Sequence, residues 1–406
     1  EHLLGLVTDA GSKTSHTVIV ARSMNIPAVV GLGDITQNVR PDDVVLVDGY
    51  EGRVIVNPSE DTLFKYGKLK DERTSIEERM LVLSKEPSLT QDGYQVQLMA
   101  NVESAAEAKK AIELGADGVG LFRTEFLFMN ARSLPTEEAH FRAYRDSVEA
   151  MKGLPIVIRT LDIGGDKVPS SSDYGMVEEA NPFLGYRAIR YCLGHTDVFL
   201  TQLRAILRAS AHGDIRIMYP MISGVFELQQ ANELLEQAKA ELREEGVAFN
   251  EDIVSGAMIE IPSAAIACDT LLKGSSFFSI GTNDLIQYMM AVDRLNDRVA
   301  HLYEPTHPAV VRTLEMIVKA AKIGGISVSV CGEMAGDPVM VPLLVGLGID
   351  TLSVTVGSLP NVKFVVQNMK IVEARDLAKE ALSEPDASKT YERLLEFYNS
   401  LMAEFY

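Results

Sequence analysis

Basic charge, cysteine and long apolar runs are all scarce in this chain of 406 residues. Its 38 Lys and Arg residues are outnumbered by 57 Asp and Glu residues, which gives a formal net charge of −19. A nucleic-acid partner is therefore not expected, because a phosphate backbone needs a basic surface. No run of about 18 apolar residues occurs, so neither a membrane span nor a membrane partner is expected.

The three cysteines, Cys192, Cys268 and Cys331, are far apart and odd in number. This pattern argues against a disulfide framework and for a reducing compartment. No secretion signal is visible either, so we expect a cytoplasmic protein. The chain opens with Glu-His-Leu-Leu-Gly-Leu-Val, which is typical of a strand already under way. We therefore expect further sequence upstream.

The length and the 47% hydrophobic content allow two or three domains with at least one large core. Residues 1–57 alternate short apolar runs with Gly, Pro and Asp, and Val44–Val47 and Val54–Val56 predict a hairpin. Residues 58–94 are rich in Lys and Glu and predict a solvated linker helix. The remaining residues, 95–406, form the third predicted region.

Strand-like segments alternate with helical patterns, such as Ala106–Leu114 and Leu228–Glu245, throughout residues 95–406. These segments are Val96–Val102, Gly118–Phe126, Pro155–Ile163, Ile215–Ile222, Ala257–Pro262, Phe277–Asp284, Ile326–Met334 and Thr351–Val356. Eight such repeats predict an α/β fold with a closed parallel (β/α)8 barrel. An open doubly wound sheet is the alternative, but it usually has fewer strands.

Charged residues gather where these strands end, and a barrel of this kind carries its active site at that rim. Arg123, Arg159 and Lys167 could hold a phosphate group. Glu260 and Asp284 could hold Mg²⁺, which takes one or two carboxylates plus water and substrate oxygens. Ordinary ion pairs along the rim are the alternative interpretation.

A second candidate site lies near the start of the chain. Small and polar residues lead to His16 at the expected first turn of a helix. The free N–H groups and positive potential of a helix N-terminus suit a phosphoryl group on an adjacent imidazole. Taken alone, a histidine after Thr-Ser is equally compatible with a capped surface residue.

Together these motifs resemble Enzyme I of the bacterial phosphotransferase system, a phosphoenolpyruvate (PEP)-protein phosphotransferase. The first, Gly11-Ser-Lys-Thr-Ser-His16 with Ile26-Pro-Ala-Val-Val-Gly31, resembles its phosphohistidine motif. Others resemble its PEP-binding barrel: Gly-Leu-Phe-Arg123-Thr-Glu-Phe, Arg159-Thr-Leu-Asp-Ile-Gly-Gly-Asp-Lys167, Asn181-Pro-Phe-Leu-Gly-Tyr-Arg187, Met258-Ile-Glu260-Ile-Pro-Ser, Ser279-Ile-Gly-Thr-Asn283-Asp284-Leu-Ile-Gln-Tyr, Ala291-Val-Asp-Arg294 and Cys331-Gly-Glu-Met-Ala-Gly-Asp337. The resemblance implies that residues 1–57 are the C-terminal part of a swivelling β/β/α phosphohistidine domain.

The resemblance also implies a role for each matching residue. It makes Glu260 and Asp284 the Mg²⁺ ligands, His16 the phosphoryl carrier and Cys331 the group that protonates the departing enolate. Substrate-binding roles fall on Arg123, Arg159, Lys167, Asn283, Asp284 and Arg294, with Arg187 nearby. The implied activity is phosphoryl transfer from PEP to His16, and then to the partner HPr in the full-length enzyme. Pyruvate is released, and a homodimer forms through the barrel.

One departure from the family pattern is local. Ser12 and Lys13 stand where the family usually has Gly and Arg, and Lys13 keeps the charge but loses bidentate geometry.

Three other functions remain open. A nitrogen-regulatory Enzyme I is not distinguished by this sequence. A pyruvate phosphate dikinase or PEP synthase is disfavoured by Met334, where dikinases usually have His, and a non-catalytic PEP sensor is disfavoured because the catalytic residues are present.

Overall fold

The computed structural model describes residues 3–11, 21, 26–49, 51–129, 133–164 and 179–403, and only the backbone of residues 69–77. The described chain divides into two compact units. The first contains the N-terminal part up to Leu81 together with Met290–Glu304, and the second contains Val82–Met289 and everything from Pro305 onward. The segment Met290–Glu304, which carries Arg294, therefore groups with the N-terminal part although it lies within the barrel sequence.

The first unit contains two small sheets and a long helix. Strands β1 (Leu6–Val7) and β2 (Ala28–Val29) pair in parallel. Strands β3 (Val45–Asp48) and β4 (Arg53–Val56) form the antiparallel hairpin that the sequence predicts. Helix α2 spans Ile35–Asn38, and helix α3 spans Glu60–Leu83 within the stretch where a linker helix is expected.

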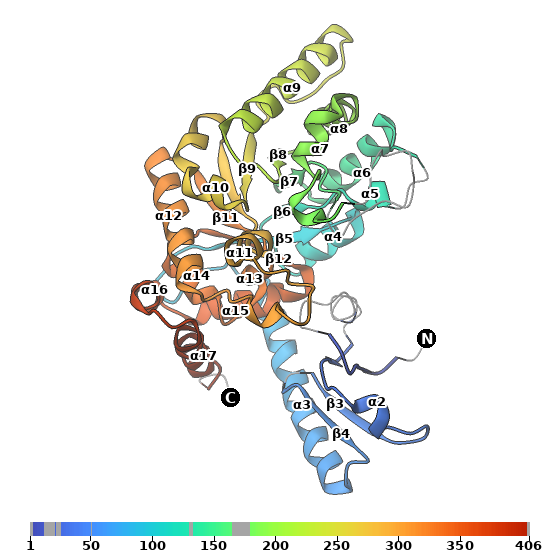
Figure 1. Ribbon diagram of the computed structural model, residues 1–406, viewed down its shortest axis with the longest axis vertical. Helices are drawn as coiled ribbons and strands as arrows, with labels where there is room; N and C mark the ends of the chain where they lie inside the picture. Colours follow the sequence, from blue (N-terminus) through green and yellow to red (C-terminus); the bar gives the residue numbers. More distant parts are fainter. Residues whose placement is uncertain are drawn as a thin grey trace. The chain divides into compact units, whose positions relative to one another are not determined.

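The second unit is built around a closed barrel of eight parallel strands, as the alternating pattern predicts (Figure 1). Each strand pairs with its sequence neighbours, and β12 closes the barrel on β5 through Thr351↔Gln97 to Thr355↔Asn101. The strands are β5 (Gln97–Val102), β6 (Val119–Phe122), β7 (Ile156–Arg159), β8 (Ile215–Tyr219), β9 (Ser255–Ile259), β10 (Phe277–Ile280), β11 (Ser327–Val330) and β12 (Thr351–Thr355).

Helices surround these strands and follow each of them along the chain (Figure 1). They are α4 (Ala105–Glu113), α5 (Phe126–Met129), α6 (Glu137–Ala150), α7 (Ile189–Gly194), α8 (Thr196–Ser210), α9 (Val225–Glu244), α10 (Pro262–Ile266), α11 (Thr282–Met290), α12 (Pro308–Gly324), α13 (Glu333–Gly336), α14 (Val341–Gly346), α15 (Leu359–Asn368), α16 (Ile371–Ser383) and α17 (Ala387–Ala403).

Local sequence signals explain where several of these helices begin and end. Ser104 caps α4 by accepting a hydrogen bond from Glu107 N, and Thr136 caps α6 by accepting one from Ala139 N. Helix α12 starts with Pro308 at its first position and ends at Gly324. Its C-terminal cap is Gly325, whose φ of 69° is the left-handed conformation that glycine adopts readily. These local interactions account for the boundaries of α4, α6 and α12.

Side chains fill the barrel interior, so the barrel has a packed core. One buried cluster joins residues from or beside six of the strands: Leu121, Val157, Met218, Met258, Phe277 and Cys331. Burial of these apolar groups is the main force that closes the barrel, at about 25 cal/mol for each Å² removed from water. Cys331 belongs to this cluster and also to the rim, so it marks where the core meets the candidate site.

Seven of the eight predicted strands end earlier in the structure than in the sequence prediction, and only β5 ends at the expected residue, Val102. Strand β10 stops at Ile280, and Asn283 and Asp284 fall in the first turn of α11. Leu285 N donates to Gly281 O at 3.0 Å, which is the first bond of that helix. The positive end of the helix dipole favours an acidic residue such as Asp284 in the first turn. Strand β6 likewise stops at Phe122 and β11 at Val330, so polar residues after each strand lie in turns or short helices.

No helix in the described part of the chain combines the length and the apolar character required to cross a bilayer.

Candidate active site

The C-terminal ends of the barrel strands bring six of the predicted site residues to one rim. Each is placed by the strand it follows, because all eight strands run in the same direction. Arg123 follows β6, Arg159 ends β7, Glu260 follows β9, Asn283 and Asp284 begin α11 after β10, and Cys331 follows β11. The sequence-based grouping of these side chains is thus reproduced by the geometry.

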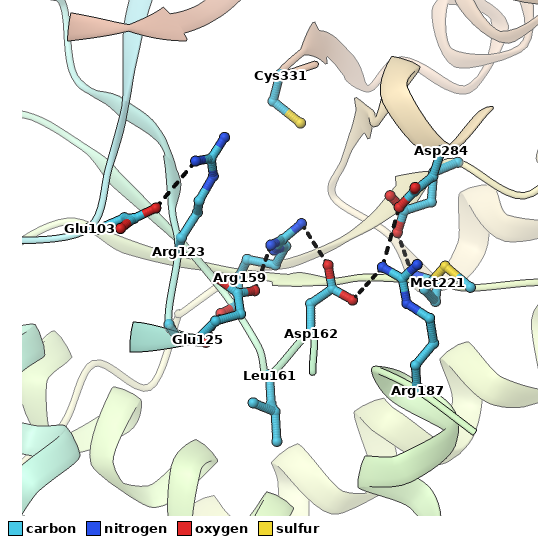
Figure 2. A network of polar contacts seen from close by, with 12 residues as sticks. Glu103, Arg123, Glu125, Arg159, Leu161, Asp162, Arg187, Met221, Asp284 and Cys331 are labelled. Carbon is cyan, nitrogen blue, oxygen red and sulfur yellow. Dashed lines mark hydrogen bonds and ion pairs between the residues drawn. The ribbon is translucent and has the colours of Figure 1, made fainter. Parts of the chain in front are cut away.

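A chain of buried ion pairs runs along this rim (Figure 2). Arg159 Nη2 lies 2.5 Å from Glu125 Oε1, and Arg159 Nη1 lies 3.0 Å from Asp162 Oδ2. The other oxygen of Asp162 lies 2.8 Å from Arg187 Nη2, which is also 3.3 Å from Asp284 Oδ2. Two guanidinium groups and three carboxylates therefore alternate, and each charge is held by a neighbour of opposite sign.

Burial and ion pairing act in opposite directions on the two arginines. Burial alone would lower the pKa of Arg159, but the charges of Glu125 and Asp162 outweigh it and raise that pKa. The pKa of Arg187 is raised in the same way, by Asp162 and Asp284 against burial. Both groups thus remain cationic. Their Nε atoms are buried without a hydrogen-bond partner among the described residues, as is Thr282 Oγ1. Spare buried donors of this kind suit an anionic ligand.

Arg123 is the more accessible cation of the rim. Its Nη1 atom lies 3.2 Å from Glu103 Oε1, and the two side chains are 38% and 48% exposed. An exposed pair of this kind contributes at most about 1 kcal/mol, so it can exchange partners at little cost. Figure 2 places Arg123 beside the buried chain of ion pairs. Arg123 is therefore free to turn toward a ligand, whereas Arg159 and Arg187 are fixed.

Glu260 and Asp284 form the candidate metal site. Burial raises the pKa of Glu260, and the charges of Asp284 and Asp162 raise it further. A cation held by these carboxylates would relieve their crowding. Among the described residues, no group of three or more His, Cys, Asp or Glu side chains is arranged to hold a metal. Two carboxylates fit Mg²⁺, which completes its shell with water and substrate oxygens.

Met221 is a part of this site that the sequence prediction missed. Its backbone N–H donates to Glu260 Oε1 at 2.6 Å and so orients the carboxylate. The backbone of Met221 has a φ of 57°, a conformation that residues other than glycine adopt only at a cost in free energy. A backbone donor leaves no signature in the identity of its residue, so only the fold reveals it.

The thiol of Cys331 points into the space between Arg123, Arg159 and Asp284 (Figure 2). Burial raises the pKa of this thiol to about 11, so it keeps its proton near pH 7. On the same rim, Asn283 Oδ1 accepts a hydrogen bond from Glu333 N at 2.8 Å. The rim thus combines fixed cations, two carboxylates and a protonated thiol.

Three predicted residues are not placed at this rim. His16 and Lys167 lie outside the described residues. Arg294 lies in the segment that groups with the first unit. The roles assigned to these three residues stay predictions. Arg187, in contrast, was expected only nearby, and the structure makes it a central member of the buried chain.

Comparison with known proteins identifies the family. The profile of the PEP-utilising enzyme, PEP-binding domain, matches residues 77–371, and that of the PEP-utilising enzyme, mobile domain, matches residues 1–52. This chain belongs to the PEP-utilising enzyme family. The barrel strands β5 to β12 all fall within the match to the PEP-binding domain of the family.

Relatives within the PEP-utilising enzymes are similar over most of the chain. The chain is 48% identical over 355 residues to a phosphoenolpyruvate-protein phosphotransferase of Priestia megaterium, with 87% of this chain and 62% of the relative covered. For the protein of the same name from Listeria innocua the identity is 44% over 396 residues, with 98% and 69% covered. For that of Staphylococcus carnosus it is 44% over 382 residues, with 94% and 66% covered. The chain thus spans about two-thirds of the length of these relatives.

Proposed function

We propose that this protein transfers the phosphoryl group of PEP to His16 and then, in the complete enzyme, to HPr, as the first step of sugar uptake by the phosphotransferase system. The observation that carries the proposal is the row of fixed cations and carboxylates along the rim beside a protonated thiol. The matches to PEP-binding and mobile domains of one family, and relatives named phosphoenolpyruvate-protein phosphotransferase, support it.

Binding of PEP falls to the cations of the rim. Arg159 and Arg187 are held in place by Glu125, Asp162 and Asp284, so they cost no reorganisation when an anion arrives. Arg123 turns from Glu103 to the ligand. Glu260 and Asp284 would hold Mg²⁺, which when bound neutralises charge on the phosphoryl oxygens.

The proposed chemistry uses His16, the arginines of the rim and Cys331. A neutral ring nitrogen of His16 attacks phosphorus in line, and the bond from phosphorus to the enol oxygen breaks with its electron pair on that oxygen. The arginines stabilise the charge that spreads over the three phosphoryl oxygens. The Cys331 thiol then gives its proton to carbon 3, which yields pyruvate, and the thiolate recovers a proton from solvent.

The test of substrate and metal is calorimetry on the protein with PEP, with and without Mg²⁺. The wild-type protein should bind PEP in a Mg²⁺-dependent manner, and Asp284→Ala should lose that dependence. Asp252→Ala is the matched control, because Asp252 is an exposed carboxylate just before β9, at the opposite end of the barrel. Absence of Mg²⁺-dependent binding in the wild-type protein would reject the proposal.

The phosphoryl acceptor is tested by labelling. Incubation with PEP that carries a labelled phosphoryl group should produce acid-labile phosphate on the wild-type protein and none on His16→Ala. In the complete enzyme the label should pass on to added HPr. An acid-stable label, or a label that persists in His16→Ala, would assign a different acceptor.

The oligomeric state forms part of the same proposal. We expect a homodimer formed through the barrel, as the resemblance to Enzyme I implies. Sedimentation at micromolar concentration with PEP and Mg²⁺ tests this expectation, and a purely monomeric species would contradict it.

A further inference from the structure

The turn after β7 is held by a side chain instead of a neighbouring strand. The register of β7 and β8 ends at Arg159↔Met218, and Thr160 N still donates to Met218 O at 2.9 Å. The next amide, Leu161 N, donates to Gln202 Oε1 of α8 at 2.9 Å. This turn carries Arg159 on one side of Leu161 and Asp162 on the other, so the contact lies between two rim charges (Figure 2).

The other end of the Gln202 amide reaches the same turn through Thr124. Gln202 Nε2 donates to Thr124 Oγ1 at 3.3 Å and to Tyr144 OH at 3.1 Å. Thr124 Oγ1 in turn donates to Arg159 O at 3.1 Å. A single amide thus binds the N–H of Leu161 directly and the carbonyl of Arg159 through one hydroxyl.

Leu161 N and Arg159 O fix the directions of the hydrogen bonds that Gln202 and Thr124 make with this turn. Tyr144 OH accepts from Gln202 Nε2 and also forms a hydrogen bond with His140 Nδ1, 2.9 Å away. Burial lowers the pKa of His140 to about 4, so the ring is neutral near pH 7. Gln202, Tyr144 and His140 are at most 1% exposed. Only one orientation of the Gln202 amide satisfies all these partners, and a satisfied buried network is rigid.

We propose that Gln202 is a positioning residue for the PEP site, an inference that rests on the function proposed above. It holds the backbone between Arg159 and Asp162, and through Asp162 it also sets the position of Arg187. Gln202 itself does not touch the rim charges. Removal of its amide lets the turn relax, and both guanidinium groups then move away from the geometry that binds the phosphoryl group.

The test compares two Gln→Met substitutions of similar volume. Gln202→Met removes the amide beneath the rim. Gln367→Met is the matched control, because Gln367 Nε2 also donates two hydrogen bonds, to Leu83 O and Pro87 O, but belongs to α15. The dissociation constant for PEP with Mg²⁺ should rise roughly 10- to 100-fold in Gln202→Met, the range typical of residues that orient ligand-binding groups. It should stay unchanged in Gln367→Met.

Amide hydrogen exchange at Leu161 provides a readout that is independent of PEP. Exchange there should be slow in the wild-type protein and in Gln367→Met, and faster in Gln202→Met. A folded Gln202→Met protein with wild-type affinity and wild-type exchange would overturn the proposal. If the wild-type protein bound no PEP, the proposed function would fail, whereas the Leu161 exchange would still decide whether Gln202 positions the turn.

A milder variant covers the case in which Gln202→Met does not fold. Thr124→Val keeps the shape of the side chain but removes the bridge from Gln202 to Arg159 O. It should raise the dissociation constant for PEP in the same direction but by less, with thermal unfolding used to verify the fold. Wild-type affinity in Thr124→Val would count against the network as the holder of Arg159.

Discussion

Arg187 Nη2 lies 2.8 Å from Asp162 Oδ1, and the two side chains are only 3% and 1% exposed. The residues are brought together because the chain returns to the end of β7, where Ala188 N donates to Ile163 O at 3.1 Å. Both charges are therefore fixed before any ligand arrives. Preorganisation of this kind is what electrostatic catalysis requires, since no energy is spent on reorienting the groups during the reaction.

Loss of Asp162 should be strongly destabilising. Asp162→Ala leaves two buried guanidinium groups short of a carboxylate, and removal of one partner of a buried pair costs about 3–5 kcal/mol in the free energy of unfolding. Urea unfolding measures this quantity. The control is Glu251→Ala, because Glu251 pairs with Arg243 at 2.8 Å with both side chains about half exposed. Its loss should cost far less, because water screens an exposed ion pair, and an equal cost for the two variants would contradict the expectation.

A side chain at Gly164 should displace Arg187. Gly164 has a φ of 111°, and an added Cβ would lie 2.3 Å from Arg187 Cβ. Gly153 has a φ of 92° but no atom within 4 Å of such a Cβ. Ala at position 153 therefore carries only the backbone strain, about 1–2 kcal/mol. Gly164→Ala should lose more stability and also weaken PEP binding, whereas Gly153→Ala should bind PEP normally. Calorimetry measures PEP binding and urea unfolding measures stability. Similar results for the two variants would show that the close contact is unimportant.

Cys331 should act after the phosphoryl group has left. Its thiol keeps a proton near pH 7 because burial raises its pKa to about 11. Cys331→Ala should therefore slow the formation of pyruvate, while the dissociation constant for PEP stays near the wild-type value. Cys268→Ala is the control, since Cys268 is also a buried cysteine but does not directly follow a barrel strand; it begins the segment Cys268–Gly274. Pyruvate formation at the wild-type rate in Cys331→Ala would assign the proton to another donor.

His140 should make the protein less stable in acid. Burial lowers its pKa from 6.5 to about 4, so the unfolded chain takes up a proton at a higher pH than the folded protein does. His140 therefore costs no stability above pH 6.5. As the pH drops from 6.5 to 4, its protonation in the unfolded chain lowers the free energy of unfolding by about 3 kcal/mol. Unfolding followed across this range should show a smaller loss in His140→Gln than in the wild-type protein or in the His212→Gln control, which alters a partly exposed histidine.

The barrel and the placement of residues at its rim could be predicted from the sequence alone. Eight apolar segments of strand length alternate with helical patterns, and parallel strands place the residues after them at one end of a barrel. This rule alone put Arg123, Arg159, Glu260, Asp284 and Cys331 on one rim. It succeeded because it depends on local periodicity and chain direction, and both can be read from the order of residues.

How those residues act on one another depends on contacts between distant segments. The pairing of Arg187 with Asp162, the N–H of Met221 on Glu260 and the hold of Gln202 on Leu161 all join segments far apart in the chain. Each contact depends on backbone direction and on packing between elements, for which an isolated sequence carries no periodic signal. Residue types thus fixed which charges are present at the rim, and long-range packing fixed which of them are held rigid and which, like Arg123, can turn to a ligand.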